Sequence, residues 1–372
     1  MRSYTLARAA FRAALAVLIC SVVFAEGIAP SGQRMANGFG AMFKPNVVTS
    51  FPCDPTAIID PSKANICLVP ESITADHEGN LYVGLTNWVS WFQNPLWEEW
   101  AKCQIVKITP DGTQIPVAVF PNESCPTTLL AGVAFDEENR LHVAVYSWST
   151  DNNTSGVYRV ETDGTQTRVL SLPADSFPNG LAFFNGDMYV SDSALGAIWK
   201  KGRHDGVIAS VPWYPNAGLL APSGFGANGI AFYQNALYIA VSNADAAGTT
   251  GSIVRLPIRH NGSPGEPEFF VRPDARLCNV DGIAFDLAGR LWFTVNTGQS
   301  GSGGRLGIVD RDGTLRILAD DPGWLDDPTM VVFGTTFRTM GTIFLTNGGM
   351  NSGQPNVLSL FVGVPGLPLP AR

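Results

Sequence analysis

A pattern that recurs six times is the feature of this sequence that most constrains its fold. Its clearest copy is Asn179-Gly-Leu-Ala-Phe-Phe, within the stretch Phe177 to Lys200, FPNGLAFFNGDMYVSDSALGAIWK. Apolar residues alternate there as in half-buried strands, and Asn185-Gly186-Asp187 supplies the chemistry of a tight reversal. Successive copies are 60, 48, 49, 53 and 48 residues apart, and they begin at Glu71, Ala131, Asn179, Asn228, Asp281 and Thr329.

Each copy predicts four short strands, and four strands at a period near 50 residues are typical of a β-propeller blade. We therefore predict an all-β, six-bladed β-propeller with four-stranded antiparallel blades. The high content of Gly (39) and Pro (26) agrees, because it favours many turns over long helices. The last copy lacks an outer strand, and the short lone strand expected at 46–51 can supply it. Closing the ring with this N-terminal strand would remove an exposed sheet edge.

The N-terminus predicts export. Arg2, Arg8 and Arg12 precede an apolar run from Ala13 to Ala25, which is the pattern of a signal peptide. That run of 13 residues is too short to span a bilayer, so we expect a secreted or periplasmic protein with no integral membrane segment after signal removal. The alternative is that the segment stays as an uncleaved membrane anchor. The expected division is a signal peptide at 1–25, a leader at 26–45, the propeller at 46–362 and a Pro-rich tail at 363–372.

Charge and cysteine content limit the partners. The net charge is −8, and loss of the signal removes three Arg and no acid, so it becomes 21 − 32 = −11. Nucleic acid is therefore not expected as a partner, whereas a cation is compatible with this charge. Five cysteines remain after the signal. Proximity in the sequence suggests the pairs Cys53 with Cys67 and Cys103 with Cys125, which leaves one thiol free or intermolecular.

The first residues of the six copies are candidates for a metal site. In a propeller the first strand of each blade starts near the central axis, so Glu71, Ala131, Asn179, Asn228, Asp281 and Thr329 should converge at one mouth of the channel. Four of them carry carboxylate or amide oxygens, which calcium prefers as ligands. The alternative is that Asn or Asp before Gly simply makes the turn into the strand. Several such residues at one axis favour the cation site, and Glu71 is not a typical turn residue.

These blade starts, together with the segment SDSALGAIWK, resemble the senescence marker protein/gluconolactonase/luciferin-regenerating-enzyme-like superfamily, which is related to the paraoxonases. The resemblance covers roughly residues 46–362. It implies a divalent ion in the channel, calcium first and zinc or manganese as alternatives, held by Glu71, Asn179, Asn228 and Asp281. It also implies hydrolysis of lactones or related esters. Members acting on sugar lactones carry Asn-Asp where this chain has Asn179-Gly180, so a polar substrate contact is missing.

The histidines are poorly placed for catalysis. His142 occupies a repeat position that is otherwise aromatic, so we interpret it as a packing residue, and His77, His204 and His260 fall in turns at the opposite end of the blades. The general base must then be a carboxylate or a metal-bound hydroxide. Our hypothesis is that the ion polarises the carbonyl and lowers the pKa of a bound water, while the catalytic Asp281 also handles the proton.

Two further segments should border the same mouth. The first blade carries an insertion, WVSWFQNPLWEEWAK, whose Trp88 and Trp91 could form a lid over an apolar or aromatic substrate; a helix packed on the rim is an equally good interpretation. Asp326 and Asp327 precede the sixth blade start. They are reserve candidates, with Asp327 as a substrate contact, and the alternative is a solvated turn before Pro328.

The sequence thus predicts an exported, metal-dependent hydrolase of lactone or ester substrates. A second hypothesis is a non-catalytic propeller that holds a structural cation and binds a ligand or protein at its mouth; the lack of a well-placed histidine and Gly180 favour it. A third is an enzyme similar to strictosidine synthase, on related blades. Propellers carry many functions, so the fold alone does not choose among them.

Overall fold

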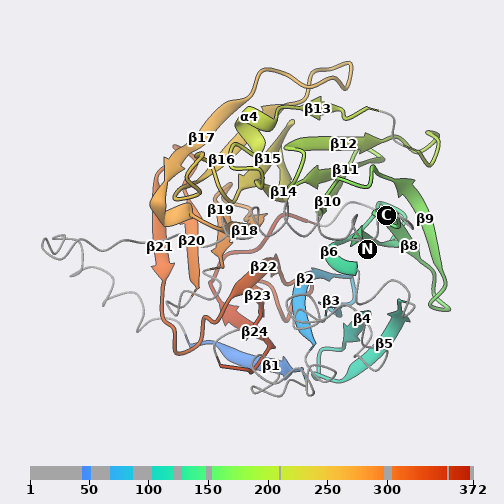
Figure 1. Ribbon diagram of the computed structural model, residues 1–372. Helices are drawn as coiled ribbons and strands as arrows, with labels where there is room; N and C mark the ends of the chain where they lie inside the picture. The colour runs from blue at the N-terminus through green and yellow to red at the C-terminus, as the bar shows by residue number, and fades with distance from the viewer. Residues whose placement is uncertain are drawn as a thin grey trace, which may run out of the picture.

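The computed structural model describes residues 44–51, 68–86, 103–120, 128–147, 153–208, 211–296, 304–349 and 352–368. Their strands form six four-stranded antiparallel sheets, which lie around a central axis as the blades of a propeller (Figure 1). This confirms the predicted fold. The helices in the described ranges are short, α4 (Ala217–Leu220) and the 3-10 turn η2 (Ala275–Leu277), and none of them is long and apolar enough to cross a membrane.

Blades 1 to 3 take their strands in chain order, with the first strand innermost. Blade 3 is the least regular, because its outer strand is only two residues long. Blade 1 holds β2 (Val69–Ala75), β3 (Leu81–Thr86), β4 (Gln104–Ile108) and β5 (Gln114–Val119); blade 2 holds β6 (Thr128–Phe135), β7 (Leu141–Ser147), β8 (Gly156–Val160) and β9 (Gln166–Ser171); blade 3 holds β10 (Pro178–Phe184), β11 (Asp187–Asp192), β12 (Ala197–Lys201) and β13 (Tyr214–Pro215).

Blades 4 and 5 follow the same order, whereas blade 6 combines both ends of the described chain. Blade 4 holds β14 (Ala227–Tyr233), β15 (Ala236–Val241), β16 (Gly251–Pro257) and β17 (Glu268–Asp274); blade 5 holds β18 (Val280–Phe285), β19 (Leu291–Val295), β20 (Arg305–Val309) and β21 (Leu315–Ala319); blade 6 holds β22 (Pro328–Phe333), β23 (Thr342–Asn347), β24 (Asn356–Phe361) and, outermost, β1 (Asn46–Ser50).

The ring closes as the sequence predicts. β1 pairs antiparallel with β24, with Asn46 opposite Ser359 and Ser50 opposite Asn356. Each inner strand contacts the inner strands of both neighbouring blades, including β2 with β22 across the closure. The outer edge of β24 is therefore covered by a strand from the other end of the chain, and blade 6 has four strands like the other blades.

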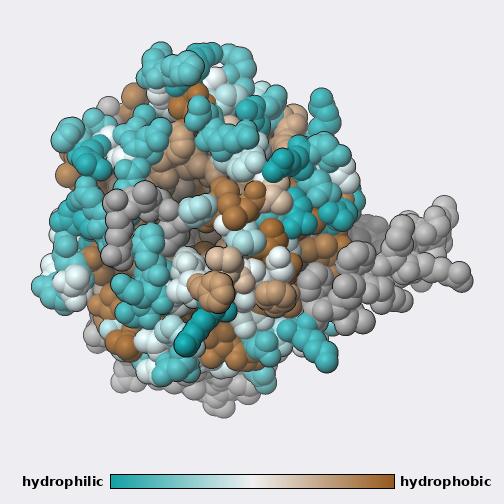
Figure 2. Space-filling model, turned by 180° about the vertical axis from the view of Figure 1, so that it is seen from behind, coloured by the Kyte–Doolittle hydropathy of each residue, from teal (hydrophilic) through white to brown (hydrophobic). Residues whose placement is uncertain are grey.

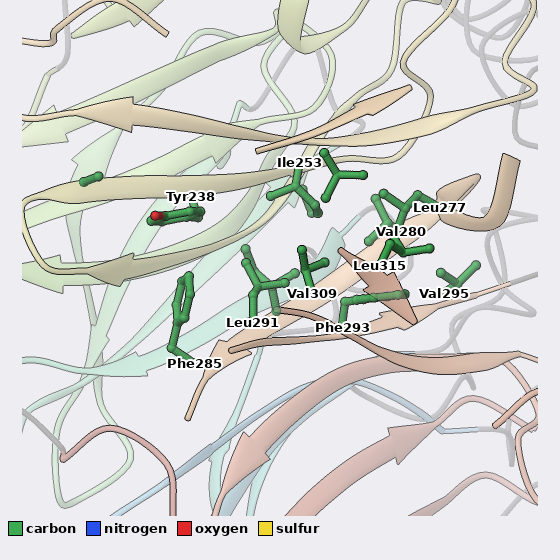
Figure 3. Close-up of a cluster of buried hydrophobic side chains, with 14 residues drawn as sticks. Tyr238, Ile253, Leu277, Val280, Phe285, Leu291, Phe293, Val295, Val309 and Leu315 are labelled. Carbon is green, nitrogen blue, oxygen red and sulfur yellow. The ribbon is translucent and has the colours of Figure 1, made fainter. Parts of the chain in front are cut away.

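The hydrophobic core consists of clusters that lie between adjacent blades, and Figure 3 shows the one between blades 4 and 5. In most of these interfaces a ring on the second strand of one blade meets the Phe of the repeated Ala-Phe pair in the next. Tyr238 meets Phe285 with ring centroids 4.7 Å apart, and His142 meets Phe183 at 4.9 Å. A single blade cannot bury this face alone, which explains why the apolar pattern recurs in every copy.

The tail and the cysteines add contacts that the repeat pattern does not contain. The described part of the tail reaches blade 5, where the N–H of Leu287 donates to the Pro365 carbonyl at 2.9 Å and the N–H of Leu367 donates to the Phe285 carbonyl at 3.1 Å. Cys103 and Cys278 are disulfide-bonded. Cys53, Cys67 and Cys125 lie outside the described residues, so each predicted pair by itself stays a prediction. The two pairs cannot both be correct, because together they would leave Cys278 unpaired. Figure 2 shows the face turned away from the viewer of Figure 1, with hydrophilic residues covering much of the rim.

Candidate functional site

The six predicted blade-start residues line one small cavity on the axis. Around it lie Glu71, Ala131, Asn179, Asn228, Asp281 and Thr329, one from each blade. We call the end of the channel where the inner strands begin the axial mouth, and the opposite end the far face. The cavity has a volume of about 20 Å³. It therefore has room for one water molecule or one ion, and not for an organic substrate.

A local irregularity in every inner strand directs these side chains. The pairing of the first and second strands shifts register at the blade-start residue in all six blades, for example between Pro178 and Leu181 and between Ala227 and Ile230. Such bulges are common beside binding sites, because one extra residue re-aims a side chain without ending the sheet. The strand pattern in the sequence does not reveal them.

The glycines that follow the blade starts are required by the neighbouring strand and not by a turn. A Cβ at Gly180 would lie 2.5 Å from the Asn228 carbonyl oxygen, and one at Gly229 would lie 2.3 Å from that of Asp281. Asn179 and Asn228 themselves lie inside β10 and β14. The interpretation of Asn-Gly as a turn into the strand is therefore wrong. Glycine at these positions allows adjacent inner strands to approach closely around the axis.

Two serines orient the axial asparagines. The Asn179 Nδ2 donates to Ser193 Oγ at 3.1 Å, and the Asn228 Nδ2 donates to Ser242 Oγ at 3.1 Å. Each serine hydroxyl in turn donates to a carbonyl of the next blade, at 2.6 Å for Ser193 to Ala227 and 2.8 Å for Ser242 to Val280. Because a carbonyl only accepts, the serine must accept from the asparagine NH₂. This leaves each asparagine Oδ1 as the atom available to a ligand.

Asp281 is a strongly perturbed carboxylate of the axial site. It is buried, and its Oδ2 accepts a hydrogen bond from Asn296 Nδ2 at 2.7 Å. Burial raises the pKa of Asp281 well above its usual range, and the nearby carboxylates of Glu71 and Asp327 raise it further, against the hydrogen bonds from Asn296 and Asn228. A buried carboxylate repelled by two others is an environment that a bound cation would relieve.

The donor set fits a hard cation. Asn228 Oδ1 is buried, and among the described residues it has no hydrogen-bond partner, although it lies on the same cavity as Glu71 and Asp281. Buried polar oxygens are normally satisfied, so this atom indicates a missing ligand or water. No three His, Cys, Asp or Glu side chains of the described ranges form a ready metal cluster by themselves. A cation here would depend on amide oxygens as well as carboxylates, as calcium sites do.

The two neighbouring acidic residues, Asp326 and Asp327, have different surroundings. Asp326 is structural, because its Oδ2 accepts the N–H of Ser352 at 2.6 Å and its own N–H donates to Asn347 Oδ1 at 2.8 Å. Asp327 is half-buried, acts on the Asp281 pKa, and has a left-handed backbone with φ of 61°. A non-glycine residue in this conformation is uncommon and is often associated with a functional site. Asp327 therefore lies beside the axial site, and its role as a substrate contact stays a prediction.

The remaining candidates differ in their relation to the axial site. Trp88 and Trp91 lie outside the described residues, so the predicted lid stays a prediction. Thr329 is occupied by bonds within the scaffold, since its Oγ1 donates to the Pro70 carbonyl at 3.1 Å and lies 2.7 Å from Thr346 Oγ1. His142 is buried toward the far face, where burial lowers its pKa to about 4. This agrees with its interpretation as a packing residue.

The sequence pattern did not reveal the residues that support the axial side chains. Ser193, Ser242 and Asn296 lie just after the second strand of blades 3, 4 and 5. Their spacing from the axial residue is 14, 14 and 15 positions. This recurrence is the signal that comparison of the repeats could have found, because a polar residue at the end of a buried strand needs a partner.

Comparison with solved structures supports the fold. A protein classed as a gluconolactonase superposes with a TM-score of 0.55 at 14% identity, covering 91% of this chain and 96% of the other. The calcium-binding protein regucalcin from Agrobacterium tumefaciens gives 0.56 at 16% identity, covering 88% and 97%. A glucose dehydrogenase gives 0.51 at 12% identity, covering 86% and 99%. No protein-family model and no curated protein sequence matches the chain.

Proposed function

We propose that this protein is an exported, divalent-cation-dependent hydrolase of lactones or related esters. One observation carries the proposal: oxygen-bearing side chains from four blades meet at an ion-sized axial cavity, and one of them, Asn228 Oδ1, is buried without a hydrogen-bond partner in the described part of the chain. The similarity in fold to a gluconolactonase and to the calcium-binding regucalcin supports it. The proposal includes membership of the gluconolactonase-like superfamily, which the first residues of the blades resemble.

Glu71, Asn179, Asn228 and Asp281 would hold the ion, with calcium the best match to two carboxylates and two amide oxygens. When bound, such an ion supplies Lewis-acid polarisation of a carbonyl and lowers the pKa of a water molecule. The serine partners keep both amide oxygens directed toward the cavity before any ligand arrives. This preorganisation reduces the cost of binding.

Asp281 would take the proton from the attacking water. Its carboxylate accepts hydrogen bonds from Asn296 and Asn228, and these two amides orient the group beside the axial cavity. Because the axial cavity accommodates only one small species, the scissile carbonyl must lie at the axial mouth, beside Asp327. No histidine of the described chain borders the axial cavity, so the proton transfer falls to a carboxylate.

Export is supported by chemistry as well as by the predicted signal peptide. Both cysteines in the described ranges, Cys103 and Cys278, are disulfide-bonded, and disulfides persist in secreted and periplasmic proteins. We therefore place the activity outside the cytoplasm, where free calcium is more abundant and a cation site of moderate affinity would be filled.

The test is a panel of lactones and esters, assayed with a chelator and then with calcium, zinc or manganese restored. We expect turnover that is lost with chelator and recovered with calcium. Asp281→Ala should abolish turnover while the circular dichroism spectrum stays unchanged, whereas Asp312→Ala, in an exposed turn of the same blade, should have no effect. Cation binding by calorimetry without any turnover would instead support the second candidate, a non-catalytic propeller with a structural cation.

A further inference from the structure

An aromatic cluster lies directly beside the axial cavity. Its buried part consists of Leu129, Ala131 and Phe177, and the half-buried rings of Tyr146 and Phe225 pack against it. Ala131 also lines the axial cavity, so the cluster and the candidate metal site share a wall. We call Tyr146, Phe177 and Phe225 the aromatic wall.

The three rings form one continuous surface from three blades. Tyr146 is the penultimate residue of the second strand of blade 2, Phe177 directly precedes the inner strand of blade 3, and Phe225 lies two positions before the inner strand of blade 4. Tyr146 stacks on Phe177 with centroids 4.2 Å apart and an interplanar angle of 22°, and Phe225 meets Phe177 edge-on at 5.2 Å. Phe177 is only 4% exposed, so Tyr146 and Phe225 carry the accessible part of the wall.

The backbone that carries the wall is firmly held. The buried Asp192 accepts the N–H of Phe177 at 2.9 Å, the N–H of Leu195 at 3.0 Å and the indole N–H of Trp199 at 2.9 Å. The Phe177 carbonyl in turn accepts the N–H of Ser193 at 2.9 Å. The wall is thus built on a fixed segment, as a binding surface requires if it is to act without reorganisation.

The opposite side of the axial mouth is polar. Two positions before the blade start, blades 2 and 3 carry Leu129 and Phe177, whereas blades 5 and 6 carry Asn279 and Asp327. Both of these polar residues have left-handed backbones, with φ of 63° and 61°. Asp327 also raises the pKa of Asp281, so it lies close to the axial site. Among the described residues, the axial mouth is therefore apolar on one side and polar on the other.

We infer that the aromatic wall selects the substrate, and that the preferred substrate is a lactone or ester carrying an extended hydrocarbon or aryl substituent. The carbonyl would lie over the axial cavity, near Asp281 and Asp327, and the substituent would lie against Tyr146 and Phe225. Substrates with hydroxyls in place of the hydrocarbon give the rings no apolar contact, and their hydroxyls lose hydrogen bonds to water when they are placed against the wall. This inference rests on the proposed function, because it names the substrate class of the same site.

The test uses γ-lactones that differ only in the substituent on the ring, methyl, butyl or hexyl, together with the corresponding lactams, which do not hydrolyse. For the wild type we expect kcat/KM to rise about fourfold for each methylene that is buried against the wall. Lactam affinity, measured by calorimetry, should rise in parallel. In Phe225→Ala and in Tyr146→Ala, the ratio of hexyl to methyl substrate should fall about tenfold, both for kcat/KM and for lactam affinity. Phe225→Leu, which keeps an apolar side chain, should retain most of the wild-type ratio.

Phe184→Ala is the matched control. Phe184 is also half-buried in blade 3 and stacked, on Phe232 at 4.7 Å, but it lies at the other end of β10. It should lower stability and leave the substituent preference unchanged. The ratio between hexyl and methyl substrates is the decisive readout, since a merely structural defect lowers turnover of both equally.

The outcomes separate this inference from the proposed function. Turnover without a substituent preference, or a preference that survives both alanine variants, overturns the aromatic wall and leaves the hydrolase in place. Lactam binding that depends on the substituent and on the wall, without turnover of any lactone or ester, keeps the wall and overturns the hydrolase. Absence of both turnover and lactam binding overturns both.

Discussion

Gly180 follows the axial Asn179, and its α-carbon lies against the backbone of blade 4. A Cβ added there would lie 2.5 Å from the Asn228 carbonyl oxygen and 2.9 Å from the Ile230 nitrogen, and both distances are too short for any real contact. The neighbouring strand therefore excludes any side chain at this position, including an acidic one. The absence of a side chain after Asn179 has a steric cause in the packing of the inner strands.

Replacing Gly180 by Ala should lower the free energy of unfolding by about 2 kcal/mol, because the neighbouring strand must move to admit the methyl group. Urea denaturation followed by fluorescence would measure the loss. Gly206→Ala is the control, since nothing lies within 4 Å of the added Cβ there. Equal unfolding midpoints for the two variants would show that the inner strands are not closely packed at the axis.

His142 makes a pH-dependent contribution to stability. Its ring is 3% exposed, its Nδ1 donates to the Arg140 carbonyl at 3.0 Å, and burial lowers its pKa from 6.5 to about 4. Between these two pH values the unfolded chain binds a proton that the folded chain does not. Stability therefore falls as the pH drops through this window, by about 3 kcal/mol in full.

The variant His142→Phe, which restores the aromatic residue of the other blades, should remove this loss. The measurement compares the change in unfolding free energy between neutral pH and about pH 4.5 in wild type and variant, with an expected difference of about 2 kcal/mol. His77→Gln, in an exposed turn, should behave as wild type. An unchanged pH dependence in His142→Phe would mean that the imidazole is not buried in its neutral form.

Among the elements, the short strand β1 closes the ring. Its pairing covers the edge of β24, and Phe51 just after it is 5% exposed and belongs to the core between blades 6 and 1. The sequence predicted this role from the missing outer strand of the last copy. It could not predict the bulges in the inner strands, because a one-residue shift in pairing depends on the neighbouring strands and not on local propensity.

Removal of residues 1–51 should expose the β24 edge and make the protein oligomerise or aggregate. Size-exclusion chromatography and light scattering would detect this, and the thermal midpoint should fall by several degrees, as loss of a few kcal/mol implies. Removal of residues 1–43 is the control, because it keeps β1. A monomeric protein of unchanged midpoint after the longer truncation would contradict ring closure by β1.

For the molecule as a whole, a cation in the axial site would link the blades whose side chains held it. Glu71, Asn179, Asn228 and Asp281 come from blades 1, 3, 4 and 5. A cation bound only by the folded ring must stabilise the whole propeller by mass action, by about 2.7 kcal/mol at a concentration one hundred times its Kd. It would also relieve the repulsion among Glu71, Asp281 and Asp327.

Calcium should therefore raise the thermal midpoint, and a chelator should lower it. The shift should disappear in Asp281→Asn, which keeps the shape of the side chain and removes its charge, and persist in Asp312→Asn, in an exposed turn. Scanning calorimetry with and without calcium is the measurement. A thermal midpoint that changes with neither calcium nor chelator would argue against a cation at the axis, whatever the protein hydrolyses.

The sequence by itself determined the fold and the axial ring. A repeat of about 50 residues with strand periodicity leaves few architectures, and residues at equivalent repeat positions must come together once the ring closes. Only the tertiary structure decided the rest. The bulges, the close approach at Gly180, the serines that orient Asn179 and Asn228, and the joining of Tyr146, Phe177 and Phe225 all depend on contacts between different blades. Such contacts leave no local pattern, because the residues that make them are far apart in the chain and meet only when the blades pack.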